Sequence, residues 1–237
     1  MCAKPIPLTP ELITELQAQK QLVLIDKPEG WTSHDIISEM RGKTGIKRIG
    51  HAGTLDPMAT GLLIVLVGRE ATRLQDIFIH MDKTYEFTAQ LGVETDTFDR
   101  TGQVVNTWPW EDVARTTQLD LEKSLTTFLG TYEQQVPAFS AVKVGGQKLY
   151  DLARRGKKVK PPTRIVRIHT LRLSECVIDH AAKTLHFSCV VECGSGTYVR
   201  SLAQDIGKTL GLGATVTSLR RTRIGYFTVQ DAHIWEK

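Results

Sequence analysis

The 237-residue sequence has no apolar run long enough to cross a membrane, since a spanning helix needs about 20 consecutive apolar residues. Its first twenty residues, MCAKPIPLTPELITELQAQK, lack the apolar core of a secretory signal peptide. The chain holds only four cysteines, and Cys189 and Cys193 have no second closely spaced pair with which to form a zinc site. We therefore expect a cytoplasmic protein with reduced thiols, no membrane association and no bound metal.

Several motifs of catalytic and cofactor-binding sites are also missing. The sequence contains no G-x-x-x-x-G-K-[ST] phosphate loop, no G-x-G-x-x-G dinucleotide fingerprint and no G-x-S-x-G nucleophile elbow. Its histidines form no H-E-x-x-H pair, and the segment TDTFDRTG departs from the spacing of a calcium loop. These absences argue against nucleotide cofactors, metal catalysis and serine hydrolases.

Charge is unevenly distributed along the chain, although the net charge is only +4. Between Lys143 and Arg172, ten Lys or Arg accompany a single acid, Asp151. Between Tyr85 and Gln135, nine acids accompany three basic residues. This distribution is compatible with one basic face that follows the phosphates of a nucleic acid, and equally with a solvated surface of mixed sign.

Hydrophobic periodicity predicts a mixture of strands and helices. The continuous apolar run at residues 61–68, GLLIVLVG, is typical of a central strand that is covered on both faces. Residues 32–45 combine a threonine cap, helical spacing and a closing glycine, and predict a helix. Residues 48–61, between these two elements, are predicted to be a loop.

The second half of the chain predicts two long paired strands, over residues 165–178 and 184–194, and a final strand over residues 215–229. A flexible flap is expected near RRGKKVKPPTR, where basic residues precede two prolines. Regular strand-helix-strand units are few. The predicted fold class is therefore α+β, with a mixed, largely antiparallel sheet flanked by helices and loops.

Asp56 is the most informative single residue, because it lies among small residues directly before the apolar run, in IGHAGTLDPMATGLLIVL. Since Pro57 follows it, Asp56 is suited to cap a short helical turn. A carboxylate with a cation nearby can also act as a nucleophile or a base, and small neighbours would admit a substrate. The two interpretations are compatible, because a capped backbone would hold the carboxylate still.

Several separated blocks of the sequence resemble the TruB family of bacterial tRNA pseudouridine-55 synthases. In the family's order they read IDKPEGWTSHDI, GHAGTLDPMATGLL, DKTYEF, TDTFDRTGQVV, QVPAFSAVKVGGQKLYDLARRG, CGSGTYVRSLAQDIG and SLRRTRIG. The resemblance implies the pseudouridine synthase fold and the isomerisation of uridine 55 in the T-loop of tRNA, without a cofactor. In that reaction the target nucleotide is flipped out, its glycosidic bond is cleaved and the uracil is reattached through C5.

The resemblance also assigns roles to residues of this sequence. Asp56 corresponds to the catalytic aspartate, and attack at C1′, attack at C6 and a glycal route are all compatible with that role. Arg200 corresponds to the arginine that pairs with it, and Tyr85 to the tyrosine that stacks on the uracil and assists removal of the C5 proton. The substrate-binding positions are His51, which helps displace the target base, Tyr198 and Leu219 in the pocket, and Lys27 at the pocket floor.

Without the resemblance, these side chains have plainer interpretations. His51 would be a loop histidine, Tyr85 a half-buried strand aromatic and Arg200 a residue on a helix surface. The basic segment that follows residue 142 in turn offers candidate phosphate contacts, or simply solvated charge: Lys143, Lys148, Arg154, Arg155, Lys157, Lys158 and Lys160.

Two features depart from the family pattern. The sequence stops shortly after the last matching block, so we expect residues 1–237 to form a single catalytic domain with no room for a C-terminal PUA domain. The block CGSGTY has Ser195 where the family often has lysine. We expect a monomer that binds the T-arm of tRNA; the alternatives are an RNA-folding helper, a guide-RNA-dependent relative and an unrelated aspartate-dependent hydrolase.

Overall fold

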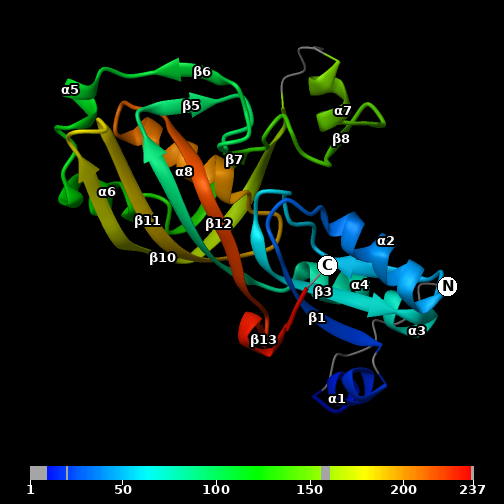
Figure 1. Cartoon of the computed structure of the whole chain (residues 1–237). Helices are drawn as coiled ribbons and strands as arrows, with labels where there is room; N and C mark the ends of the chain where they lie inside the picture. The colour runs from blue at the N-terminus through cyan, green and yellow to red at the C-terminus, as the bar shows by residue number, and fades with distance from the viewer. Residues whose placement is uncertain (1–9, 20, 156–160, 236–237) are drawn as a thin grey trace. The chain divides into compact units, whose positions relative to one another are not determined.

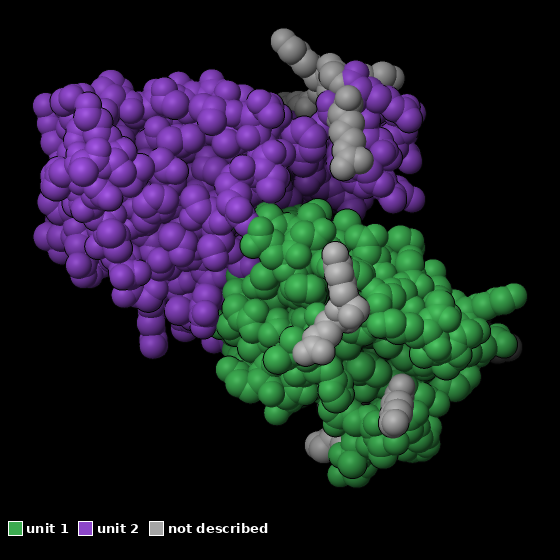
Figure 2. Space-filling view, viewed as in Figure 1, with its two compact units in different colours: residues 1–84, 220–237 green, residues 85–219 purple. Residues whose placement is uncertain are grey.

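The computed structural model describes residues 10–19, 21–155 and 161–235. The chain divides into two compact units: unit 1 contains residues 1–84 and 220–237, and unit 2 contains residues 85–219 (Figure 2). Two strands, β4 (Lys83–Leu91) and β12 (Ala214–Ile224), include residues of both units, so the chain leaves and re-enters unit 1 along them. The expectation that residues 1–237 form one catalytic domain stays a prediction.

Unit 1 is built around the strand β3 (Thr60–Val67) (Figure 1). This strand pairs antiparallel with β1 (Leu22–Lys27) and β2 (Ile49–Ala52), and parallel with the part of β12 that belongs to the unit. β14 (His233–Ile234) pairs parallel with β1. The helices of unit 1 are α1 (Pro10–Ala18), α2 (Ser33–Thr44), α3 (Gly68–Thr72), α4 (Gln75–His80) and the short 3-10 helix η1 (Val229–Asp231).

The predicted burial of β3 on both faces is confirmed. Leu62, Ile64 and Leu66 pack into a cluster with side chains of α1, α3 and α4. Leu63 and Val65 pack into a second cluster with side chains of α2. Because successive side chains of a strand point to opposite faces, a strand between two such clusters needs an uninterrupted apolar run.

The helix predicted over residues 32–45 is also confirmed, as α2. Thr32 Oγ1 accepts a hydrogen bond from the Asp35 N–H at 3.0 Å, and Asp35 Oδ2 accepts one from the Thr32 N–H at 2.8 Å. Gly45 ends the helix with a left-handed conformation, φ +69°. The reciprocal cap and the terminal glycine satisfy backbone groups that a helix end leaves unpaired.

Unit 2 contains a sheet with helices packed against it (Figure 1). Its strands follow the order β12, β4, β11 (Thr184–Cys193), β10 (Thr163–Asp179) and β7 (Gly130–Gln135), and the β10–β11 pair confirms the two long paired strands. α6 (Gln118–Thr126) packs on β10, and α8 (Val199–Thr209) packs on β7. The other elements are β5 (Val93–Thr95), β6 (Val104–Thr107), α5 (Trp110–Val113), β8 (Lys143–Val144), β9 (Gln147–Lys148) and α7 (Leu149–Arg154).

The α+β class and the mixed, largely antiparallel pairing are confirmed, but two segments differ from expectation. The loop predicted over residues 48–61 begins with β2, whose four residues are too few for a periodic signal and form a strand by pairing with β3. The strand predicted over residues 215–229 ends at Ile224. Gly225, with φ +54°, then reverses the chain, and β13 (Phe227–Thr228) pairs back on Arg223 and Ile224.

Candidate functional site

The predicted site residues belong to both units. Lys27, His51 and Asp56 lie in unit 1, and Tyr85, Tyr198, Arg200 and Leu219 lie in unit 2. No helix among the described residues is long and apolar enough to cross a membrane. In the same part of the chain, no three or more His, Cys, Asp or Glu residues are grouped so that they could hold a metal ion.

Asp56 lies half-buried in the loop that connects β2 to β3. Pro57 and Met58 form a single turn, closed by a hydrogen bond of 3.1 Å from the Ala59 N–H to the Asp56 carbonyl. The short turn required by the capping interpretation is therefore present. Because β3 begins at Thr60, no helix follows this turn, and Asp56 lies only a few residues before the strand.

A buried serine fixes the backbone directly before Asp56. Ser33, at the start of α2, is 1% exposed. Its Oγ accepts a hydrogen bond from the Leu55 N–H at 2.9 Å and donates one to the Leu55 carbonyl at 3.3 Å. The N–H and the carbonyl of Leu55 are thus both satisfied by one side chain, which restricts the backbone that leads into Asp56.

A buried lysine fixes the backbone directly after Asp56. Lys27, at the end of β1, is fully buried, and its Nζ donates to the carbonyls of Trp31 at 2.6 Å, Pro28 at 2.9 Å and Pro57 at 3.4 Å. The Pro57 carbonyl also accepts from the Gly30 N–H at 2.8 Å. The turn KPEGW is thereby connected to the residue next to Asp56, which agrees with a supporting role for Lys27.

Burial and neighbouring charges lower the pKa values of Lys27 and His51, which lie near this loop. Burial lowers the pKa of Lys27 to about 8, the negative charge of Asp56 opposes this shift, and the positive charge of Arg221 adds to it. Burial likewise lowers the pKa of His51 to about 4, assisted by the charges of Arg221 and His34. His51 is consequently a neutral imidazole near pH 7 and does not supply a cation to Asp56.

Arg221, a residue that the sequence did not single out, holds both ends of the same loop. Its side chain is almost completely buried, at 1% exposed. Nε donates to the Leu62 carbonyl at 2.8 Å, and Nη2 donates to the Gly53 carbonyl at 3.0 Å. Nothing local in SLRRTRIG distinguishes it from its neighbours Arg220 and Arg223, because both carbonyls belong to distant parts of the chain.

In unit 2, the aromatic and apolar candidates are well anchored. Tyr85 in β4 and Leu219 in β12 are buried, at 8% and 6% exposed. Tyr198 is half-buried at the start of α8. The Gln134 side chain bonds to its backbone, accepting a hydrogen bond from the Tyr198 N–H at 2.8 Å and donating one to the Tyr198 carbonyl at 3.1 Å. The Arg164 guanidinium carbon lies 5.5 Å from the centre of the Tyr198 ring.

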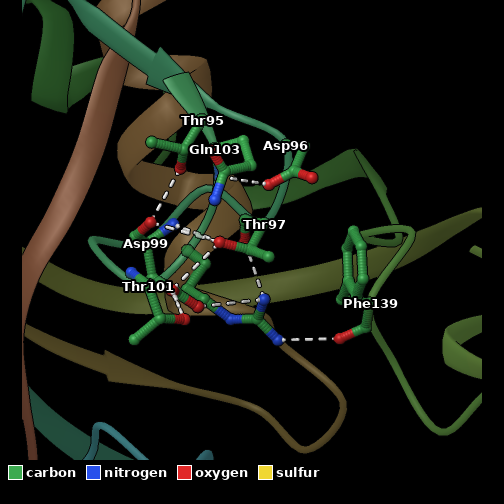
Figure 3. Close-up of polar contacts among 8 residues, drawn as sticks. Thr95, Asp96, Thr97, Asp99, Thr101, Gln103 and Phe139 are labelled. Carbon is green, nitrogen blue, oxygen red and sulfur yellow. Dashed lines mark hydrogen bonds and ion pairs between the residues drawn. The ribbon is translucent and has the colours of Figure 1, made fainter. Parts of the chain in front are cut away.

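Arg200 is a buried residue of α8, at 3% exposed, and the surface interpretation is wrong. It donates to the carbonyls of Thr97 at 2.7 Å and Phe139 at 3.1 Å, and its Nη1 lies 3.4 Å from Asp99 Oδ2 (Figure 3). The pairing of Arg200 with Asp56 stays a prediction.

Asp99 is the second residue that the sequence did not single out. Its other oxygen, Oδ1, accepts from Thr101 Oγ1 at 2.6 Å, from the Thr101 N–H at 2.9 Å and from Thr97 Oγ1 at 3.0 Å (Figure 3). The carboxylate is buried, at 4% exposed, and its hydrogen bonds fix it against the guanidinium. An aspartate flanked by threonines at positions −2 and +2 is a signal for such a turn, within TDTFDRTG.

The candidate phosphate contacts are only partly described. Lys143, Lys148 and Arg155 are exposed residues of β8, β9 and the end of α7. The remaining candidates, Lys157, Lys158, Lys160 and the side chain of Arg154, lie outside the described residues.

Two solved structures have a similar fold. A chain in the crystal structure of a Cbf5-Nop10-Gar1 complex superposes with a TM-score of 0.63 at 27% identity, over 90% of this chain and 51% of that one. A chain in an H/ACA RNP bound to a substrate RNA containing 2′-deoxyuridine superposes with a TM-score of 0.65 at 22% identity, over 99% and 57%. The chain thus spans little more than half the length of these structures, and the second likeness concerns the fold alone.

Sequence comparisons are more specific. A protein called tRNA pseudouridine synthase B from Aquifex aeolicus (strain VF5) is 44% identical to this chain, over 89% of this chain and 70% of its own length. The protein of that name from Corynebacterium jeikeium (strain K411) is 41% identical, over 91% of this chain and 70% of its own length. The protein of that name from Opitutus terrae is 40% identical over 92% of this chain and 87% of its own length. The model of the tRNA pseudouridylate synthase B C-terminal domain matches residues 200–237. Because the model of the TruB family pseudouridylate synthase N-terminal domain matches residues 41–199, the chain belongs to the TruB family of pseudouridylate synthases.

Proposed function

We propose that this protein converts uridine 55 in the T-loop of tRNA to pseudouridine, with Asp56 as its catalytic residue. Membership in the TruB family and the relatives named tRNA pseudouridine synthase B support the reaction and the substrate class. The observation that carries the assignment of Asp56 is the anchoring of its loop. Ser33 and Lys27 hold the backbone on either side of Asp56, while Asp56 as a residue is only half-buried.

The reaction needs positioning rather than an external reagent. The bond between N1 and C1′ breaks, a bond between C5 and C1′ forms, the C5 proton leaves and N1 gains a proton, so the atoms of the substrate are conserved. The target nucleotide must first leave its stack, because its glycosidic bond is inaccessible there. In this proposal Asp56 acts on the flipped nucleotide, and Tyr85 stacks on the uracil and assists removal of the C5 proton.

The other residues orient these two groups. Arg200 is the cation that orients Asp56, and Asp99 in turn fixes the guanidinium through an approach of 3.4 Å. His51, neutral near pH 7, contacts and helps displace the target base. Tyr198 and Leu219 line the pocket, and Lys27 supports the loop of Asp56 from below.

The proposal extends to the partner and the setting. The protein would act on tRNA in the cytoplasm as a monomer, with the T-arm as the bound element and the basic residues after position 142 as phosphate contacts. Light scattering of the purified protein with and without a T-arm hairpin tests this part, since a monomer should form a one-to-one complex.

The decisive experiment is tritium release from an unmodified tRNA transcript labelled at C5 of uridine. The wild type should release tritium without guide RNA or partner proteins, Asp56→Asn should release none, and a transcript with cytidine at position 55 should be inert. Tight tRNA binding with no release would favour the RNA-folding helper instead. Release that appears only when a guide RNA is added would favour the guide-dependent branch.

A further inference from the structure

Arg221 is a buried cation to which the proposed reaction gives no direct role. It is 1% exposed, and its two hydrogen bonds end on backbone carbonyls rather than on a carboxylate. Burying a cation is unfavourable unless hydrogen bonds or a counter-charge compensate, and an apolar side chain of similar volume is often as good for stability alone. The arrangement therefore suggests that the guanidinium does more than fill space.

The two carbonyls that Arg221 holds define the loop of Asp56. Gly53 is the first residue after β2, and Leu62 lies just inside β3, so the loop between them starts and finishes at the same guanidinium. Ser33 and Lys27 bind the interior of the loop, at Leu55 and Pro57. Among these three side chains, only Arg221 bonds to both ends of the loop, which the pairing of Ala52 with Ile64 also brings together.

Two glycines of the loop, Gly53 and Gly61, lie close to Arg221. β12 pairs parallel with β3, and Arg221 lies opposite Gly61 in the register. A methyl group on Gly61 would stand 2.2 Å from the Arg221 carbonyl oxygen, and one on Gly53 would stand 3.4 Å from Nη1. At Gly61 the loop thus approaches the backbone of Arg221 more closely than a residue with a Cβ allows, and at Gly53 it lies in ordinary contact with the guanidinium.

We propose that Arg221 is a positioning residue for Asp56, which uses its two-point hydrogen bond to the carbonyls of Gly53 and Leu62 to fix the ends of the catalytic loop. The inference rests on the proposed catalytic role of Asp56. Two donors on different nitrogens of a rigid guanidinium hold a separation that the single nitrogen of a flexible lysine does not. A catalytic group displaced by about 1 Å loses on the order of 100-fold in rate, so this separation affects the chemical step.

The test compares Arg221→Met, Arg221→Lys and the matched control Arg223→Met. Arg223 is on the same strand, but it donates to Thr84 Oγ1 and to the Gly225 carbonyl, away from the loop. Tritium release is measured in single turnover with enzyme in excess, tRNA affinity by filter binding, and hydrogen exchange by mass spectrometry on peptides covering residues 53–62.

We expect Arg221→Met to bind tRNA as the wild type does but to react about 100-fold more slowly, with faster exchange in the loop peptides. Arg221→Lys keeps the charge but places all its donors on one nitrogen of a flexible side chain, and should lose about 10-fold, less than Arg221→Met. Arg223→Met should keep the wild-type rate and exchange. A purely structural role for Arg221 would instead lower the unfolding temperature and leave the rate of the folded fraction unchanged.

The outcomes separate this inference from the proposed function. If Arg221→Met reacts at the wild-type rate, the positioning role is wrong although the reaction stands. If Arg221→Met does not fold, Arg221→Lys tests the positioning role. A wild-type rate together with wild-type exchange in Arg221→Lys would show that the two hydrogen bonds to Gly53 and Leu62 are not needed, and would overturn the proposal. If the wild type itself releases no tritium, the proposed function fails, and unchanged loop exchange in the variants would then refute the positioning role independently.

Discussion

Replacing Gly61 with alanine measures how closely β3 and β12 approach each other in unit 1. Gly61 has φ +101°, a backbone conformation that residues with a Cβ rarely adopt. Its added methyl group would stand 2.2 Å from the Arg221 carbonyl oxygen and 2.8 Å from the Arg221 nitrogen. These neighbours are backbone atoms of a paired strand, so relief requires the two strands to separate.

The expected loss has two parts. The strained conformation costs about 1–2 kcal/mol, and overpacking against a backbone that cannot rotate away adds about 1–3 kcal/mol. The sum, about 2–5 kcal/mol, is a large share of the stability of a typical domain, about 5–15 kcal/mol. For a chain of this size it corresponds to a fall in Tm of about 10 °C.

Gly68→Ala is the matched control, because it separates conformational strain from steric overlap. Gly68 also has a positive φ, +88°, but a methyl group there would meet nothing within 4 Å. Its loss should be limited to the strain, about 1–2 kcal/mol. Both variants are compared by urea unfolding and calorimetry, and equal losses in the two would refute the close approach of β3 to β12.

Three other predictions concern buried polar groups. Asp99→Asn should lower the free energy of unfolding by about 3 kcal/mol in urea titrations, because it leaves the Arg200 guanidinium without its buried carboxylate 3.4 Å away; an unchanged midpoint would contradict this. Ser33→Ala should cost about 1–3 kcal/mol and slow tritium release, since the Leu55 N–H loses its partner at 2.9 Å, and a fully active variant of wild-type stability would disprove the anchoring. His51 has a pKa of about 4 in the folded protein, whereas a histidine in the unfolded chain titrates near 6.5. As the pH falls, the unfolded chain therefore binds a proton before the folded protein does. This preference lowers the free energy of unfolding by up to about 3 kcal/mol between about pH 6.5 and pH 4. His51→Gln should remove that loss, and a difference between the two proteins that does not vary with pH would count against a buried neutral imidazole.

Local pattern accounts for much of the secondary structure. The apolar run of β3 and the caps of α2 are decided by residues within one element, so periodicity and capping chemistry suffice to find them. β2 was missed for the opposite reason. Its four residues have no pattern of their own and become a strand only through pairing with β3.

The candidate site divides in a similar way. Asp56 was identifiable because its motif and its small neighbours are contiguous in the chain. Asp99 carried a local signal as well, two flanking threonines, but its importance comes from Arg200, more than a hundred positions later. In the sequence alone, an aspartate that only forms a turn cannot be distinguished from one that also pairs with a buried guanidinium.

The amino-acid sequence alone predicts the fold class, the strand β3 covered on both faces, the TruB family and the position of the candidate catalytic aspartate, because periodicity, caps and motifs that are each contiguous in the chain carry these signals. Which polar groups hold that aspartate in place becomes visible only in the folded chain. Arg221 reaches carbonyls 159 and 168 positions away. Such contacts follow from the register between β12 and β3, which brings one of several arginines against the loop and buries it where backbone carbonyls can take its hydrogen bonds.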